Sequence, residues 1–164
     1  MLRMSKLADY GTVIMTTMAR YPEKVQSAAD ISAASHLPVP TVSKILKTLT
    51  REGLVVSLRG AHGGYMIARP ATEISVIEII VAMDGPIGMT ECTVTPGTCP
   101  QEATCPIRPN WQHVNRMVLN TLRQVTLDQM LRPPPAEPTN ISALKLRRPS
   151  PANASPAKAV TANP

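Results

Sequence analysis

The first part of the chain carries apolar residues at helical intervals. Five of them, which follow a possible N-cap at Ser5, share one face of an expected first helix: Leu7, Tyr10, Ile14, Met15 and Met18. The sequence Ser27-Ala-Ala-Asp30 has the form of a capping box and predicts a second helix that ends near Ser35. Pro38 then interrupts the helical pattern, because proline disfavours helix at the residue before it.

A third helix is expected from Pro40 to about Glu52, because proline suits the first helical position and Gly53 follows as a stop. Its inward positions are Val42, Ile45, Leu46 and Leu49. Two short helices with a tight turn between them, the second basic on its outer face, are typical of a helix-turn-helix. This helix alone is equally consistent with an ordinary amphipathic helix. The residues expected to contact DNA from it are Pro40, Thr41, Ser43, Lys44, Lys47 and Arg51.

Two short β-strands are expected after this helix, over 54–58 and 65–68, with the glycine-rich turn 59–64 between them. The three glycines of the turn permit backbone angles that a side chain would obstruct. A hairpin that follows a recognition helix is a wing. Arg59 and His62 are therefore expected to enter a minor groove or to contact phosphates.

The second part of the chain predicts two more helices. One lies within 74–84, with Ser75 as its cap and Gly85-Pro86 as its stop. The other is longer, over 111–131, and carries an apolar stripe that a small domain cannot cover: Trp111, Val114, Val118, Leu122 and Val125. Pairing of two copies would bury this stripe and place two recognition helices on a palindromic operator. An intramolecular core helix is the alternative.

We therefore expect a mainly α-helical chain with a small β-hairpin wing. Residues 1–70 would form a winged helix-turn-helix domain. Residues 71–132 would hold a connecting helix, a cysteine-containing loop (91–108) and the dimerisation helix (111–131). Residues 133–164 include eight prolines and show no apolar periodicity, which predicts a disordered tail.

Charge and composition indicate which class of partner the chain binds. The net charge is +6, and residues 1–69 carry nine Lys or Arg against four Asp or Glu, which favours a polyanion such as double-stranded DNA. Aromatic residues make up only 2% of the chain, which argues against recognition of RNA or single strands by stacking of bases on aromatic side chains. Neither a membrane-spanning run nor a signal peptide is recognisable, so we expect a cytoplasmic protein with reduced thiols.

All three cysteines, Cys92, Cys99 and Cys105, lie in one Pro- and Gly-containing loop with the spacing C-x6-C-x5-C. Thiolates are soft ligands that suit zinc, copper(I) or an iron–sulfur cluster. The loop has no C-x-x-C motif, which argues against a thioredoxin-like redox pair and most structural zinc motifs. Spacing alone leaves open three unligated thiols, a zinc-stabilised DNA-binding protein and a thiol redox enzyme.

The run from Ser5-Lys-Leu-Ala-Asp-Tyr10 through Pro40-Thr-Val-Ser-Lys44 to Arg59-Gly-Ala-His-Gly-Gly-Tyr65, followed by the clustered cysteines, resembles the Rrf-type winged-helix repressors. This family includes the cluster-assembly regulator IscR and the nitric-oxide sensor NsrR. The resemblance covers about residues 1–132 and looks closest to the branch that regulates the SUF cluster-assembly genes. It implies a homodimeric, non-enzymatic repressor of those genes. A nitric-oxide-responsive or iron-responsive repressor is the alternative within the family.

The resemblance also implies a 2Fe–2S or 4Fe–4S cluster with Cys92, Cys99 and Cys105 as ligands, although this chain has one extra residue between the first two. IscR-like members place a fourth ligand, His, where this chain has Arg108, which cannot ordinarily bind iron. NsrR-like members take an aspartate from the partner's first helix, and Asp9 matches that position. His113 and Glu102 are further candidates.

Overall fold

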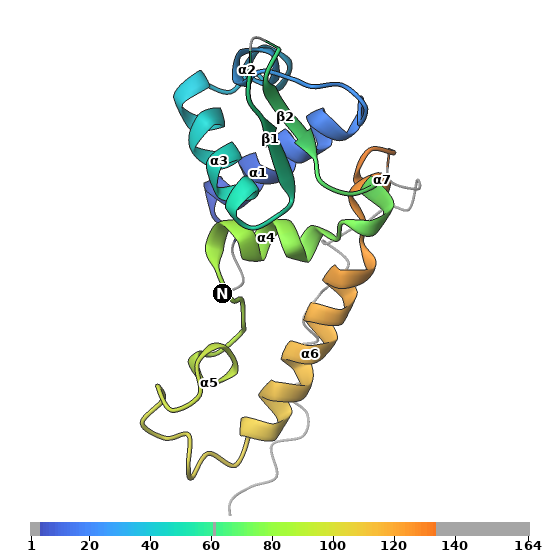
Figure 1. The fold of residues 1–164 in the computed structure, drawn as a ribbon. Helices are drawn as coiled ribbons and strands as arrows, with labels where there is room; N and C mark the ends of the chain where they lie inside the picture. Colours follow the sequence, from blue (N-terminus) through green and yellow to red (C-terminus); the bar gives the residue numbers. More distant parts are fainter. Residues whose placement is uncertain (1–3, 61, 134–164) are drawn as a thin grey trace, which may run out of the picture. The chain divides into compact units, whose positions relative to one another are not determined.

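The structure is a computed structural model that describes residues 4–60 and 62–133. Figure 1 shows a mainly helical chain with one two-stranded antiparallel hairpin, which confirms the expected fold class. The tail expected to be disordered lies, from residue 134 onward, outside the described residues. The elements are α1 (Lys6–Ala19), α2 (Ala28–Ser35), α3 (Val39–Arg51), β1 (Val55–Leu58), β2 (Gly64–Ile67), the 3-10 turn η1 (Ala71–Glu73), α4 (Val76–Asp84), α5 (Glu91–Val94), α6 (Arg108–Gln124) and α7 (Leu127–Met130).

Three of the predicted helix caps, Ser5, Ser27 and Ser75, are confirmed. The Ser5 hydroxyl accepts the Ala8 amide at 3.1 Å and caps α1. Ser27 and Asp30 form the capping box of α2, and the hydrogen bonds from Ser27 hold the pKa of the Asp30 carboxyl below its ordinary value. At α4 the Ser75 amide donates to the Glu78 carboxylate at 2.8 Å. Each cap satisfies backbone amides that a helix start leaves without partners.

One hydrophobic core joins the first three helices and the hairpin to later parts of the chain. The inward face of α3 is at most 1% exposed, as its spacing predicted. Ile79 of α4 and Leu127 of α7 belong to the same buried cluster. α1 packs closely on α4, where a methyl group at Gly11 would lie 3.0 Å from the Met83 side chain. The core therefore continues beyond residue 70.

The expected helix over 111–131 is wrong in its extent. α6 starts at Arg108 and ends at Gln124, and α7 is a separate turn of helix. The break occurs because the Val125 carbonyl accepts the Val76 amide at 2.8 Å and the Leu127 amide donates to the Ile74 carbonyl at 2.8 Å. The backbone at the end of α6 is thus used to hold the start of α4. Within the two described ranges, every helix is too short or too polar to span a bilayer.

Candidate nucleic-acid interface and cysteine segment

The outer face of α3 presents the predicted DNA contacts. Pro40, Lys44, Lys47 and Arg51 are exposed, whereas Thr41 and Ser43 are half-buried. Arg51 forms an exposed ion pair with the adjacent Glu52 at 2.9 Å. For the two lysines, no carboxylate among the described residues lies within ion-pair distance. Both ammonium groups are therefore free to meet phosphates.

The turn between α2 and α3 directs the start of α3 outward. His36 ends α2 in the left-handed region, at a φ of 56°. The Ser32 hydroxyl then donates to the Leu37 carbonyl at 2.5 Å and holds the turn against α2. Pro38 precedes α3, which begins at Val39, one residue earlier than predicted. Val39 is 45% exposed, so the leading end of α3 is free of the core.

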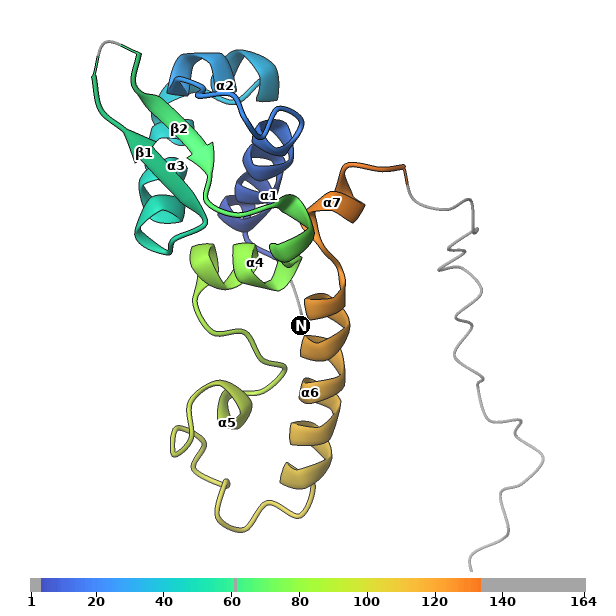
Figure 2. The ribbon, with the colours of Figure 1, turned by 45° about the vertical axis from the view of Figure 1, so that its right-hand side comes forward.

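The hairpin β1–β2 is the predicted wing, with Val55 opposite Ile67 and Leu58 opposite Gly64. Figure 2 shows its turn at the far end of the hairpin from α4. Arg59 and His62 are exposed in this turn, on either side of the undescribed residue 61. The start of β2 is anchored to the segment before α2 by a bridge between Gln26 and Tyr65 (2.8 and 3.0 Å). The wing and the α2–α3 pair are thus held together by backbone hydrogen bonds.

The cysteine segment, residues 91–108, lies between α4 and α6 and beside the first turns of α6 (Figures 1 and 2). Cys92 is on the short helix α5, which the sequence did not predict and which Thr90 caps. Cys99 and Cys105 follow in irregular structure. All three are free and half-buried. Three reduced thiols on one segment fit, as a donor set, an iron–sulfur cluster.

The segment does not draw these donors together. Across residues 4–60 and 62–133, no group of three or more His, Cys, Asp or Glu side chains is placed to hold a metal ion. Asp9 is exposed in the first turn of α1, and His113 is exposed on α6. Of the candidates for a fourth ligand, only Glu102 is buried, with 9% exposure. It is bound at 2.6 Å to Arg108, the residue that stands where IscR-like members have a histidine ligand.

Sequence reasoning missed two contacts that shape this segment. The Glu102 carboxylate accepts the Gly97 amide at 2.6 Å as well as binding Arg108. Asn115, buried on α6, accepts the Met89 amide at 3.2 Å. The only signal of the first contact was a carboxylate six residues before an arginine. The second had no signal, because an asparagine on a helix is usually exposed.

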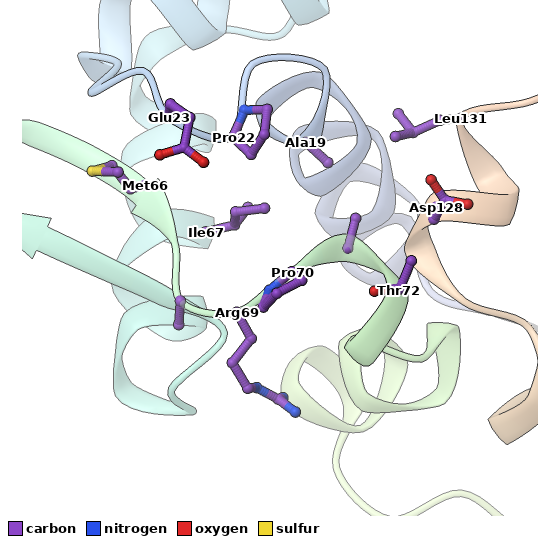
Figure 3. Close-up of a pocket in the computed structure, with 12 residues that line it drawn as sticks. Ala19, Pro22, Glu23, Met66, Ile67, Arg69, Pro70, Thr72, Asp128 and Leu131 are labelled. Carbon is purple, nitrogen blue, oxygen red and sulfur yellow. The ribbon is translucent and has the colours of Figure 1, made fainter.

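A separate hollow of about 430 Å³ lies between α1, β2, η1 and α7 (Figure 3). Two of its three charged groups have partners, since Arg69 binds Glu78 at 2.7 Å and Asp128 binds Arg132 at 2.8 Å; the third, Glu23, is exposed. No cysteine or histidine is among the described residues that line it. Thiol or metal chemistry therefore belongs to the cysteine segment.

The known proteins that this chain resembles share its fold and are transcriptional regulators. The sequence model of the Rrf2 family, described as an iron-dependent transcriptional regulator, matches residues 4–133. Protein rrf2 of Nitratidesulfovibrio vulgaris is 27% identical over 132 residues, which cover 80% of this chain and 88% of that protein. These relatives are transcriptional regulators and not enzymes.

Two solved structures are similar over most of the chain. CymR, the global cysteine regulator of B. subtilis, is 29% identical with a TM-score of 0.63, and the match covers 80% of this chain and 97% of that one. IscR of T. potens is 27% identical with a TM-score of 0.60, and the match covers 79% and 86% respectively. The winged-helix fold is therefore shared across the described part of the chain.

Proposed function

The chain belongs to the Rrf2 family of DNA-binding transcriptional regulators, and from this membership we propose that it is a repressor whose operator affinity depends on an iron–sulfur cluster. The observation that carries the proposal is the cysteine segment. All three cysteines of the chain lie in this segment between α4 and α6, and their thiols are free and half-buried. Soft donors collected on one segment suit 2Fe–2S or 4Fe–4S binding better than they suit a surface without a role.

Cys92, Cys99 and Cys105 would hold the cluster. Asp9 of a second copy would be the fourth ligand, since within this chain Asp9 is exposed and Glu102 is bound to Arg108. The cluster supplies iron–sulfide bonding that iron scarcity, oxygen or nitric oxide can destroy. Without the cluster, no common ligand would hold the three cysteine thiolates together. Occupancy can therefore select between two arrangements of the segment.

DNA recognition would use the exposed face of α3 in the major groove and the wing turn beside it. Lys44 and Lys47 would contact phosphates, and Arg59 and His62 would contact the adjacent groove or backbone. Two copies would pair through the exposed apolar face of α6, which includes Trp111, 36% exposed, and Met117, 57% exposed. The homodimer would then bind a palindromic operator in the cytoplasm.

The chain offers a continuous route from the cysteine segment to the DNA-binding face. Asn115 joins α6 to Met89, two residues before the cysteine segment. At the C-terminal end of α4, which leads into this stretch, Asp84 accepts hydrogen bonds from both the amide and the hydroxyl of Ser5, the cap of α1. A change in the segment can thus displace α4 and α1, on which α2 and α3 pack.

We propose the SUF cluster-assembly genes as the target, which rests on the resemblance of the Ser5–Tyr10 and Arg59–Tyr65 runs. A regulator of cysteine metabolism without a cluster is the second candidate, since the similar CymR is a cysteine regulator. An iron- or nitric-oxide-responsive repressor would share the cluster but not the target. A zinc-stabilised protein would share neither the cluster nor its colour.

The test is to purify the chain without air and to measure iron, sulfide and visible absorbance. We expect iron and sulfide in the ratio of a cluster, and loss of the visible absorbance in each of the Cys92→Ser, Cys99→Ser and Cys105→Ser variants. Survival of the absorbance in all three variants would contradict the ligand set. One zinc and no sulfide per chain would select the zinc-stabilised protein, and absence of any metal would favour the CymR-like candidate.

A further inference from the structure

A partly buried ion pair, between Glu102 and Arg108, lies within the cysteine segment. Glu102 lies between Cys99 and Cys105 in sequence, and it is only 9% exposed. One carboxylate oxygen, Oε1, lies 2.6 Å from Nη2 of Arg108, at the start of α6. The other, Oε2, accepts the Gly97 amide at 2.6 Å. One buried carboxylate therefore connects the stretch before Cys99 to the first residue of α6. We call Gly97, Glu102 and Arg108 the Glu102 clamp.

Backbone hydrogen bonds link the clamp to two of the cysteines. The Glu102 amide donates to the Cys99 carbonyl at 3.0 Å, and the Arg108 amide donates to the Cys105 carbonyl at 3.3 Å. The clamp residues thus set where these two cysteines lie. Cys92 is outside the clamp, on α5, where its sulfur is 3.3 Å from the Thr90 hydroxyl.

The clamp is held by strong contacts but is incompletely satisfied. A charge-assisted hydrogen bond to a buried carboxylate is stronger than a neutral one. However, Arg108 Nε is also buried, and no acceptor among the described residues lies within hydrogen-bond distance of it. A buried donor without a partner destabilises the arrangement that contains it. The clamp can therefore hold the segment in one arrangement and still be opened by a competing interaction.

We propose that the Glu102 clamp is a lock on the metal-free segment, which must open before the three sulfurs can converge on one metal centre. This inference rests on the proposed function, because it concerns the same three thiols. Glu102 is then a positioning residue and not the fourth ligand. In the clamped arrangement, no three His, Cys, Asp or Glu side chains of residues 4–60 and 62–133 are placed to hold a metal ion, so metal binding requires another arrangement. The clamp therefore lowers the apparent metal affinity.

The experiment titrates the metal-free, reduced full-length chain with Co(II), whose thiolate charge-transfer absorbance reports sulfur ligation. Glu102→Gln removes the charge of the clamp, and Arg108→Gln removes its partner. We expect each variant to bind Co(II) about tenfold more tightly than the wild type. The double variant should bind no more tightly than either single variant, because both substitutions remove the same Glu102–Arg108 interaction and their effects do not add. Glu91→Gln is the matched control: Glu91 is exposed in the same segment, and its side chain makes no hydrogen bond within residues 4–60 and 62–133.

A measurement on the wild type keeps the test independent of how the variants fold. Hydrogen exchange at the Gly97 amide should be slow in the metal-free chain and faster after Co(II) is added, because metal binding releases the Glu102 carboxylate. Weaker or unchanged Co(II) binding by Glu102→Gln, or a Gly97 amide that stays protected, would overturn the lock. So would a wild type without thiolate–cobalt absorbance. Iron and sulfide analysis of the anaerobic wild type separates this failure from that of the proposed function: iron and sulfide in the ratio of a cluster would leave the proposed function standing without the lock, and the absence of both would refute the cluster itself.

Discussion

Lys44 shows how a single residue can be tested for DNA contact without affecting the fold. It is exposed on α3 and has no ion-pair partner among the described residues. Lys44→Ala should weaken operator binding to about the same extent for all sequences. It should also lower the slope of log affinity against log salt by about 1, because one phosphate contact is lost. Fluorescence anisotropy at several salt concentrations measures both. Lys24→Ala, on the loop between α1 and α2, is the control; equal loss in both variants would contradict the α3 interface.

Glu78 gives the chain a specific pH dependence. Burial acts to raise the pKa of Glu78, but hydrogen bonds from Arg69 and Ser75 outweigh it and hold the pKa below its ordinary value. A carboxyl with a lowered folded pKa stabilises the fold fully above its unfolded pKa, about 4.3, and loses this contribution as the pH falls through the folded value. Glu78→Gln should therefore be less stable than the wild type near pH 7.

The difference in free energy of unfolding between the two proteins, from urea titrations, should shrink as the pH falls below about 4. Glu23→Gln is the control, because Glu23 is exposed and its side chain makes no hydrogen bond to the described residues. A difference that is constant with pH would show that the ion pair with Arg69 does not stabilise the fold.

At the scale of elements, the sequence predicted the features that depend on neighbouring residues, such as helix caps. Ser5, Ser27 and Ser75 cap helices as expected, because a cap needs only residues within one turn. The break between α6 and α7 depends instead on backbone hydrogen bonds that Val125 accepts from Val76 and that Leu127 donates to Ile74, residues some fifty positions earlier. The apolar stripe continues past the break, so periodicity alone could not reveal it. The Glu102 clamp was missed for the same reason: burial of a loop carboxylate is a tertiary property.

Gly64 tests how the wing is attached. A methyl group there would lie 2.6 Å from the Gln26 carbonyl oxygen, a backbone atom that cannot move aside without breaking the bridge to Tyr65. Gly64→Ala should lower the free energy of unfolding by about 1–3 kcal/mol and weaken operator binding as well. Urea unfolding and anisotropy measure the two effects. Full stability in this variant would mean that the Gln26–Tyr65 bridge does not hold the wing.

At the scale of the whole molecule, α6 is the proposed dimer interface. Its apolar residues are more exposed than those of the other long helices, and Met117 is 57% exposed. A charge placed in a buried interface is costly, so Met117→Glu should give monomers at micromolar concentration and a large loss of operator affinity. Analytical ultracentrifugation provides the test. Gln112→Glu, exposed on the same helix, should remain dimeric; a wild type that is itself monomeric would contradict the interface.

The central claim is that occupancy of the cysteine segment controls operator binding. The most direct measurement is the operator affinity of one anaerobic preparation, divided into a cluster-containing part and a part treated with chelator. A coupling of ordinary size predicts that the two dissociation constants differ by about tenfold or more. In Cys99→Ser, treated and untreated protein should bind alike. Equal affinities of the two wild-type parts would contradict the account and leave a DNA-binding protein whose cysteines do not regulate it.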